Sequence, residues 1–445
     1  MTELIRVKSL HIENIKNVSN GTIEFPDYDE NTDIKSNIVG LYGQNGSGKT
    51  AAVNAFRIIQ KLISGNSILP YKDLRTVQAL YSLVEMTFLV IIDEVKLHVV
   101  YSVKVAKVGQ LEETLSYKNL ISDEKSSVTV SEEAFNKNKV FLPVDRNNDF
   151  GINKSNELSY MVTRQTSINA YQSFLFNREF NVTFIENLHD EYFKKIMNVL
   201  PKYITKHTFI IENSRSANSS INLVFPIGLL FINSDGEEQY VDNTFGYQDN
   251  KCYEHQYKAI KQGIESINSV IKTIIPNLSV DIRETSETKT AFGEKEYTFK
   301  MVAVRDGMEF PYAWESDGIK KIISFISCLI HMYNHESSFV VVDEFDSEVF
   351  EFLIGEILQV LKEGGKGQMF FTSHNLRPLE ILDPKDIWFA TTNPQKRYIQ
   401  FKNVKSNHNL RDLYFRTIQL GGQKEEIYLS TDQYKIRNAF TKVEK

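Results

Sequence analysis

Residues 37–50 read NIVGLYGQNGSGKT, an apolar run that leads directly into a glycine-rich loop. The loop, residues 43–50, fits the pattern G-x-x-x-x-G-K-[ST] at every position. Its glycines let successive backbone N–H groups curl around phosphate oxygens, where a side chain would obstruct them. Residues 51–63 carry apolar side chains at helical spacing, so a helix should begin here and point the positive end of its dipole at the same anion. The stretch predicts a strand–loop–helix unit that binds nucleotide phosphates.

The loop assigns individual roles. Lys49 should reach the β- and γ-phosphates as a point charge, and the Thr50 hydroxyl should bind Mg²⁺. The alternative is a chance glycine-rich turn, but a buried strand precedes the loop and an amphipathic helix follows it, as phosphate binding requires. The predicted cofactors are ATP and Mg²⁺. The predicted ATP-binding residues are Gly43, Gln44, Asn45, Gly46, Ser47, Gly48, Lys49, Thr50 and Ala51.

A second signal is the acidic pair that ends the run Phe339-Val-Val-Val-Asp343-Glu344. Four apolar residues in a row are typical of a strand buried on both faces. Ligands of open α/β sheets collect at the carboxyl ends of strands, so both acids should lie beside the phosphates. Asp343 is predicted to hold the Mg²⁺ water shell, and Glu344 to act as the general base for the attacking water. The alternative is a helix N-cap followed by a first-turn acid.

Composition limits the class of protein. The 445 residues suggest two or three lobes, and no uninterrupted apolar run approaches the ~20 residues that span a membrane. The start, MTELIRVKSLHIEN, alternates like a strand and not like a signal peptide. Only two cysteines are present, which fits a reducing cytoplasm. The net charge of −6 argues against a generally basic nucleic-acid binder, although a local basic groove stays open.

The patterns along the chain predict an α/β fold with a mixed or mainly parallel sheet flanked by helices. Polar residues 108–160 predict loops, and no apolar heptads support a long coiled coil. We therefore expect two ATPase lobes, 1–107 and 277–445, around a largely helical insertion, 108–276. The predicted strands are 4–12, 21–25, 37–42, 84–92, 95–103, 278–284, 295–305, 339–342, 368–372 and 386–390. The predicted helices are 51–63, 186–205, 252–275, one from 317, and 347–362.

The distance between the two motifs makes the pattern more specific. Lys49 and Asp343 are 343 − 49 = 294 positions apart, and Trp314-Glu-Ser-Asp-Gly-Ile-Lys-Lys321 precedes the acidic strand. This segment resembles the signature L-S-G-G-Q of ABC/SMC-type ATPases. The resemblance implies that Ser316, Asp317 and Gly318 cap a helix whose end meets the γ-phosphate bound to the opposite protomer. Asp317 departs from the pattern by replacing the first glycine. The alternative is an ordinary capped amphipathic helix.

Three further elements match the same family. Phe345-Asp346-Ser347 resembles the D-loop that crosses the dimer interface. His374, after an apolar run, resembles the switch histidine and is a predicted catalytic residue with Lys49 and Glu344. Asn14-Ile-Lys16-Asn17 resembles the N-F-[RK] element, whose basic residue approaches the phosphates. For Lys16, a solvated side chain is the alternative. The glutamine loop of the family has no evident counterpart.

The resemblance covers residues 1–105 and 278–402. It implies an ABC-type ATPase head like those of SMC and RecF proteins, which hydrolyses ATP as a homodimer or higher homo-oligomer. The last 445 − 374 = 71 residues carry no recognisable nuclease cluster. The chain resembles the ATPase subunit of the PARIS anti-phage system and, more distantly, that of Septu and AbiL-type systems. That similarity implies abortive infection through a separate Toprim-type nuclease effector and a phage trigger protein. The alternative is a RecF-like ATPase that binds DNA in repair; a membrane partner is not expected.

Overall fold

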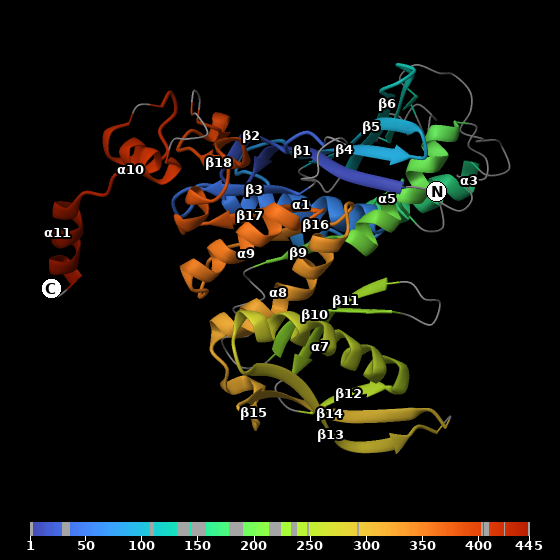
Figure 1. The fold of residues 1–445 in the computed structure, drawn as a ribbon. Helices are drawn as coiled ribbons and strands as arrows, with labels where there is room; N and C mark the ends of the chain where they lie inside the picture. The colour runs from blue at the N-terminus through green and yellow to red at the C-terminus, as the bar shows by residue number, and fades with distance from the viewer. Residues whose placement is uncertain are drawn as a thin grey trace.

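The computed structural model describes residues 3–28, 36–106, 111–130, 142–143, 157–177, 190–212, 224–232, 238–246, 249–291, 293–401, 404, 409–421 and 423–443. Figure 1 shows two sheets with helix α1 between them, and a separate group below them that contains α7, β13 and β14. The described helices are α1 (Lys49–Ile63), α3 (Glu157–Asn169), α5 (Glu191–His207), α7 (Glu254–Ile274), α8 (Asp317–Asn334), α9 (Glu351–Gly364), α10 (Leu410–Leu420) and α11 (Gln433–Val443).

The first sheet is antiparallel throughout, with strand order β2-β1-β4-β5-β6-β7-β8. Its long strands alternate buried and partly exposed residues, because one face packs on the core. The strands are β1 (Glu3–Ile15), β2 (Val18–Glu24), β4 (Tyr81–Ile92), β5 (Val95–Ala106), β6 (Leu111–Asn119), β7 (Lys125–Val130) and β8 (Leu142–Pro143).

The second sheet carries the motifs. Its order is β19-β18-β3-β17-β16-β9, and every pair is parallel except β18 with β19. All four residues of β16 are buried, and they alternate between two hydrophobic cores, one on each face of the sheet. The strands are β3 (Asn37–Tyr42), β9 (Thr208–Ile211), β16 (Phe339–Val342), β17 (Gln368–Ser373), β18 (Ile387–Ala390) and β19 (Tyr398–Ile399).

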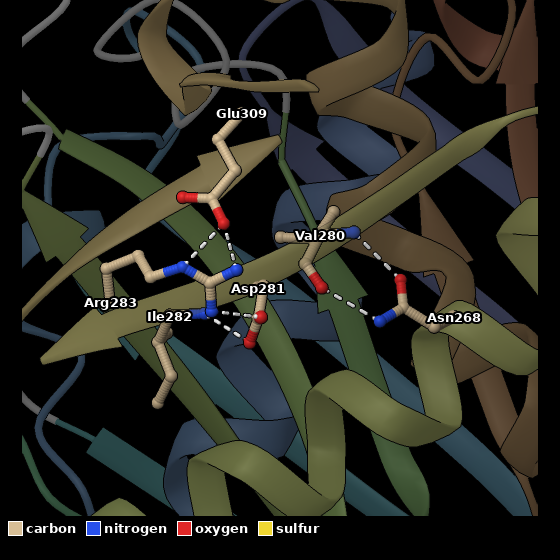
Figure 2. Close-up of polar contacts among 6 residues, drawn as sticks. All are labelled: Asn268, Val280, Asp281, Ile282, Arg283 and Glu309. Atoms are coloured by element: carbon tan, nitrogen blue, oxygen red, sulfur yellow. Dashed lines mark hydrogen bonds and ion pairs between the residues drawn. The ribbon is translucent and has the colours of Figure 1, made fainter. Parts of the chain in front are cut away.

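A smaller group lies on the far side of α8. β14 pairs with β12, β13 and β15, and β10 pairs with β11. Helix α7 is fixed to β13 by Asn268, whose amide nitrogen donates to Val280 O and whose oxygen accepts from Val280 N, both at 2.8 Å (Figure 2). The strands are β10 (Val224–Ile232), β11 (Glu238–Gly246), β12 (Asn250–Tyr253), β13 (Leu278–Lys289), β14 (Lys295–Arg305) and β15 (Met308–Pro311).

Two buried polar side chains join the two sheets. Arg6, 1% exposed, donates to Glu336 O, Lys366 O and Asn37 Oδ1, each at 2.7 Å. The Gln368 amide pairs with the backbone N–H and C=O of Val7 at 2.7 and 2.8 Å. Burial lowers the pKa of Arg6 to about 10. These contacts fix the first sheet over the second, with α1 enclosed between them.

The α/β class and the parallel motif-bearing sheet are confirmed, but two expectations for the middle of the chain are wrong. Residues 111–119 and 125–130, expected as loops, are strands β6 and β7, and the segment expected to be largely helical also contains β9 to β12. The cause is visible at Glu113, which is buried and accepts hydrogen bonds from Tyr101 Oη (2.7 Å), Ser173 Oγ (2.5 Å) and Phe174 N (2.7 Å). A carboxylate on the inner face hides the alternation on which strand prediction depends. Parts of 108–276 lie outside the described residues.

Among the helices that the structure describes, none has the length and apolar character needed to cross a lipid bilayer.

Candidate nucleotide-binding site

The glycine-rich loop lies where the sequence predicts it, between β3 and α1. Gly46 and Gly48 have φ values of 76° and 97°, the left-handed region that favours glycine. A Cβ on Gly48 would lie 2.6 Å from Val18 Cγ2, and a Cβ on Gly43 would lie 2.5 Å from Ser47 Oγ. The loop therefore needs glycine for its conformation and for its close packing.

Lys49 folds back over this loop. Its Nζ donates to Gly43 O at 2.7 Å and to Gln44 O at 3.1 Å, and only 6% of the residue is exposed. Burial lowers its pKa to about 8, although the charges of Asp343, Glu344 and Asp346 oppose that shift. The ammonium group thus occupies the mouth of the loop, with the acidic residues near enough to affect it.

A turn between β1 and β2 closes one side of the loop. Asn17 Nδ2 donates to Gly46 O, and Lys16 has a φ of 52°. Burial lowers the pKa of Lys16, while Asp343 and Glu212 raise it. Lys16 is therefore close enough to the acids to interact with them. Lys16 is nevertheless exposed, so the solvated side chain considered from the sequence stays an alternative.

Two residues at this site were not predicted from the sequence. Arg397 Nη2 donates to Asn17 O at 2.5 Å, and Tyr398 Oη donates to Gly48 O at 2.8 Å. They follow β18 and carry no motif. Their role depends on β19 lying beside β18, which no local pattern indicates.

The acidic pair lies at the carboxyl end of β16, as predicted. Asp343 is 4% exposed, and its Oδ1 accepts from Thr372 Oγ1 at 2.6 Å. Burial raises the pKa of Asp343, with Glu344 adding to the shift and the Thr372 hydrogen bond, Lys49 and Lys16 opposing it. The same Thr372 oxygen accepts from Glu344 N at 2.8 Å. One hydroxyl on β17 therefore orients both acidic residues, and the sequence did not assign it a role.

Glu344 has a left-handed backbone, with φ at 50°. A non-glycine residue keeps such a conformation only where its surroundings hold it. Thr372 binds its N–H, and the buried Lys321 donates Nζ–H to its carbonyl at 2.5 Å. Residues in sparsely populated conformations cluster at functional sites, so this geometry supports a role for the Glu344 carboxylate.

Asp346, in the loop after β16, contacts the backbone of His374, which directly follows the neighbouring strand β17. Asp346 Oδ2 accepts from the backbone nitrogens of His374 at 3.1 Å and Asn375 at 2.9 Å. His374 is exposed. Desolvation is the larger cause that lowers the pKa of the His374 imidazole, and the charge of Lys49 lowers it further. The acids Asp346, Glu344 and Asp343 oppose this shift. The imidazole is thus favoured in its neutral form close to the loop.

The signature-like turn opens α8, as predicted. Ser316 is the N-cap, and its Oγ accepts from Ile319 N at 3.4 Å. Gly318 packs so closely on the loop after β16 that a Cβ there would overlap Glu348 O. Asp317 pairs with Lys320 at 3.5 Å. Within the described residues, no hydrogen bond or ion pair joins 316–318 to residues 43–50.

The residues present fit a nucleotide with Mg²⁺. Ser47 Oγ is buried in the loop and has no hydrogen-bond partner in the described part of the chain, and Lys49 has only its own loop's carbonyls. Thr50 and Asp343 supply the oxygen ligands that Mg²⁺ prefers, and such sites are completed by phosphates and water. No cluster of three or more His, Cys, Asp or Glu suited to a metal occurs among the described residues.

Comparison with known families agrees with this geometry. A family model described as "AAA domain, putative AbiEii toxin, Type IV TA system" matches residues 38–380, and a second AAA domain model matches 9–61. The first match covers well over half of the 445 residues. The protein has an AAA-type nucleotide-binding domain. It belongs to the family that this first model describes. No curated protein matches the sequence significantly.

Several solved structures are similar over most of their length. An SMC head bound to the C-terminal winged-helix domain of ScpA is 12% identical, with 89% of this chain and 97% of that chain covered and a TM-score of 0.43. The SMC head domain from Thermotoga maritima is 14% identical, covering 89% and 99% with a TM-score of 0.40. The recombination mediator RecF with ATP is 11% identical, covering 84% and 92% with a TM-score of 0.35. At these values the similarity does not extend to function.

Proposed function

We propose that the protein is an ABC-type ATP hydrolase whose active site is completed by a second copy of the chain. The proposal rests on the separate placement of two groups of motifs. Residues 43–50, Asp343, Glu344 and His374 gather at one edge of the second sheet, whereas the Ser316-capped end of α8 makes no polar contact with the loop in the described chain. In the proposed pair, an ATP bound to the loop of one copy would meet Ser316 of the other copy.

The binding half of the site has a simple electrostatic logic. The backbone N–H groups of the loop and the N-terminus of α1 favour an anion. Lys49 would exchange its two carbonyl contacts for the phosphates, and Lys16 lies close enough to add a second positive charge. Thr50 and Asp343 would hold Mg²⁺, which neutralises charge that develops on the phosphates.

The hydrolytic half rests on Glu344. Its carboxylate would take a proton from water as the water oxygen bonds to the γ-phosphorus and the bond to the β-phosphate oxygen breaks. Neutral His374 would donate a hydrogen bond to the γ-phosphate, and Asp346 fixes the backbone that presents it. Ser316 of the partner copy would cap the same phosphate.

Two substitutions test this assignment. Lys49→Ala should remove ATP binding, measured by calorimetry. Glu344→Gln should keep ATP bound and lower kcat by at least about 100-fold, because general-base catalysis typically contributes that much. A Glu344→Gln protein that turns over ATP at the wild-type rate would show that another group activates the water.

For the biological role, we propose an anti-phage function like that of the PARIS ATPase subunit, with a separate Toprim-type nuclease effector and a phage trigger. The net charge of −6 supports this role over a RecF-like clamp on DNA. Co-purification of a nuclease with the full chain would support it. Binding of duplex DNA that weakens steeply with salt, without such a nuclease, would favour the RecF-like role instead.

A further inference from the structure

Helix α11 is amphipathic, and its large apolar side chains are exposed in the described part of the chain. Ile436 and Phe440 lie one turn apart and are 45% and 75% exposed. Figure 1 shows α11 standing apart from the other elements at the C-terminal end of the described chain. Its charged residues, Lys435, Arg437 and Lys442, are all basic. An exposed apolar stripe flanked by one sign of charge is typical of a helix that docks elsewhere.

A groove of complementary character lies between α7, α8 and α9. It encloses about 580 Å³ and is lined mainly by aliphatic and aromatic side chains. Val360 and Tyr333 on its rim are 56% and 39% exposed. Glu356 is the charged side chain among the described residues that line it, and Glu363 lies two turns further along the same face of α9. The groove is therefore apolar inside and acidic along one wall.

The apolar face of α11 and the α7–α8–α9 groove are complementary in shape and in charge. Helix-in-groove recognition uses anchors spaced i and i+4, which Ile436 and Phe440 provide. Arg437 and Lys435 flank that stripe on opposite sides, where either can approach the acidic wall formed by Glu356 and Glu363. Asn268 pairs with the backbone of Val280, which fixes α7, one wall of the groove, to β13 (Figure 2).

The position of the segment before α11 indicates which copy would provide the groove. The preceding segment is anchored to the nucleotide loop, because Leu429 N donates to Gln44 Oε1 at 2.9 Å and Ile427 is 3% exposed. Three residues separate Leu429 from Gln433, a reach of roughly 10–14 Å before the helix begins. The helix thus leaves from the loop that, in the proposed pair, faces α8 of the other copy.

We propose that α11 of one copy docks into the α7–α8–α9 groove of a second copy in the ATP-bound pair. The inference rests on the proposed function for the pairing itself. Eleven residues bury less than the ~1,200 Å² of a stable interface, so the contact strengthens the nucleotide-mediated pair and does not replace it. In this way each subunit would reach across the bound nucleotide and hold its partner.

Cross-linking between distinguishable copies tests the proposal. A tagged full-length chain carries Phe440→Cys and an untagged one carries Val360→Cys. Both also carry Glu344→Gln to retain ATP and Cys252→Ser, because Cys252 is the partly exposed one of the two cysteines and Cys328 is buried. With a small disulfide such as oxidised glutathione added as the two-electron oxidant, we expect an ATP-dependent disulfide between the tagged and untagged chains. Asn438→Cys, which places the thiol on the opposite side of α11, is the matched control and should cross-link at least several-fold less.

Each alternative occupant gives a different result. A cross-link that forms only within a chain carrying both cysteines would mean that α11 folds back on its own groove, and the proposal would be wrong. No cross-link in either arrangement would also overturn it. If ATP still pairs the Glu344→Gln chains in these cases, the inference fails while the proposed function stands.

Charge reversal provides a second test that does not depend on cysteine geometry. Glu356→Lys should lower the cross-linking yield several-fold at low salt, because it places a cation against Arg437. Arg437→Glu in the other copy should restore the yield. Equal yields for all combinations would exclude the acidic wall as the determinant of docking.

Discussion

At the scale of single residues, one hydroxyl positions both acids of the site. Thr372 Oγ1 donates to Asp343 and accepts from the N–H of Glu344, so its loss removes one hydrogen bond from a buried carboxylate and one from a strained backbone. Groups that orient metal-binding carboxylates typically contribute 10–100-fold to metal affinity or activity.

Thr372→Val should therefore lower kcat for ATP by about 10–100-fold and raise the Mg²⁺ concentration needed for half-maximal activity, without unfolding the protein. Steady-state kinetics at several Mg²⁺ concentrations measures this. Thr372→Ser keeps the hydroxyl and should remain within a few-fold of wild type. Equal losses in both variants would assign the effect to the missing methyl group and packing.

Lys49 predicts a pH dependence of ATP binding. Its pKa in the free protein is lowered to about 8, and bound phosphates would raise it again. The group is charged below pH 8 and neutral above it, so ATP affinity should be constant below about pH 8. Above that pH it should fall by up to tenfold per unit, because binding must then take up a proton.

The Kd for ATP measured at pH 7, 8 and 9 checks this expectation. The triphosphate is already ionised over that range, since its relevant pKa is about 6. Lys49→Arg carries a charge that does not titrate below pH 12, so its affinity should not vary with pH. A wild-type Kd that is the same at pH 7 and 9 would contradict the perturbed lysine.

Site residues could be predicted from the sequence where their motif is local, but not where their partners lie far away along the chain. Lys49, Asp343 and Glu344 stand in short motifs whose chemistry is local. Thr372 and Arg397 act through neighbours about 30 and 380 residues away, and only the order of strands brings them together. No local pattern marks them.

At the scale of elements, the junction between α8 and the loop after β16 determines where Ser316 lies. Gly318 contacts the backbone at Glu348, and Lys321 binds the carbonyl of Glu344. The end of α8 is thus coupled directly to the residue proposed as the general base.

Gly318→Ala should destabilise the protein by about 1–3 kcal/mol, because the methyl group would overlap a backbone carbonyl that has little room to move. Denaturant unfolding measures the change. Ser324→Ala on the same helix should cost less than about 0.5 kcal/mol, as is usual for positions away from such contacts. A Gly318→Ala protein as stable as wild type would show that α8 shifts freely.

Trp314, immediately before the signature-like turn, offers an optical signal. It is 74% exposed, whereas Trp388, the other tryptophan, is 9% exposed. If ATP brings a second copy against this end of α8, the emission of Trp314 should shift to shorter wavelength as water is excluded.

Titration of ATP into Glu344→Gln protein should produce this shift, and Trp314→Phe should abolish it without affecting ATP binding. A shift that survives in Trp314→Phe would arise at Trp388 and would not report pairing.

Element prediction succeeded where burial follows apolar periodicity and failed where it does not. The strand 339–342 and helices α1 and α8 follow from their apolar spacing. β6 was missed because Glu113, which faces the core, is satisfied by three hydrogen bonds that come from Tyr101, Ser173 and Phe174. The tertiary partners, and not the segment itself, make that strand possible.

At the scale of the whole molecule, the two halves of the ATPase are far apart in sequence but form one sheet. β3 lies between β17 and β18, and Arg6 with Gln368 fixes the first sheet above them. The sequence predicted two ATPase lobes, and the resemblance to ABC/SMC-type ATPases, which the 294-residue interval made more specific, implied that they form one ATPase head. It could not predict that the apolar side chains of α11 are exposed in the described part of the chain, because a helical pattern does not show what a helix packs against.

The central claim is that one copy binds ATP and another completes the site with Ser316. The most direct measurement is the molecular mass in solution of Glu344→Gln protein, with and without ATP, compared with the same protein carrying Ser316→Arg. We predict that ATP pairs the Glu344→Gln chains, and that Ser316→Arg binds ATP with similar affinity but stays unpaired. If Ser316→Arg pairs as readily as its parent, the serine-capped end of α8 does not meet the nucleotide, and a second copy does not complete the site through Ser316.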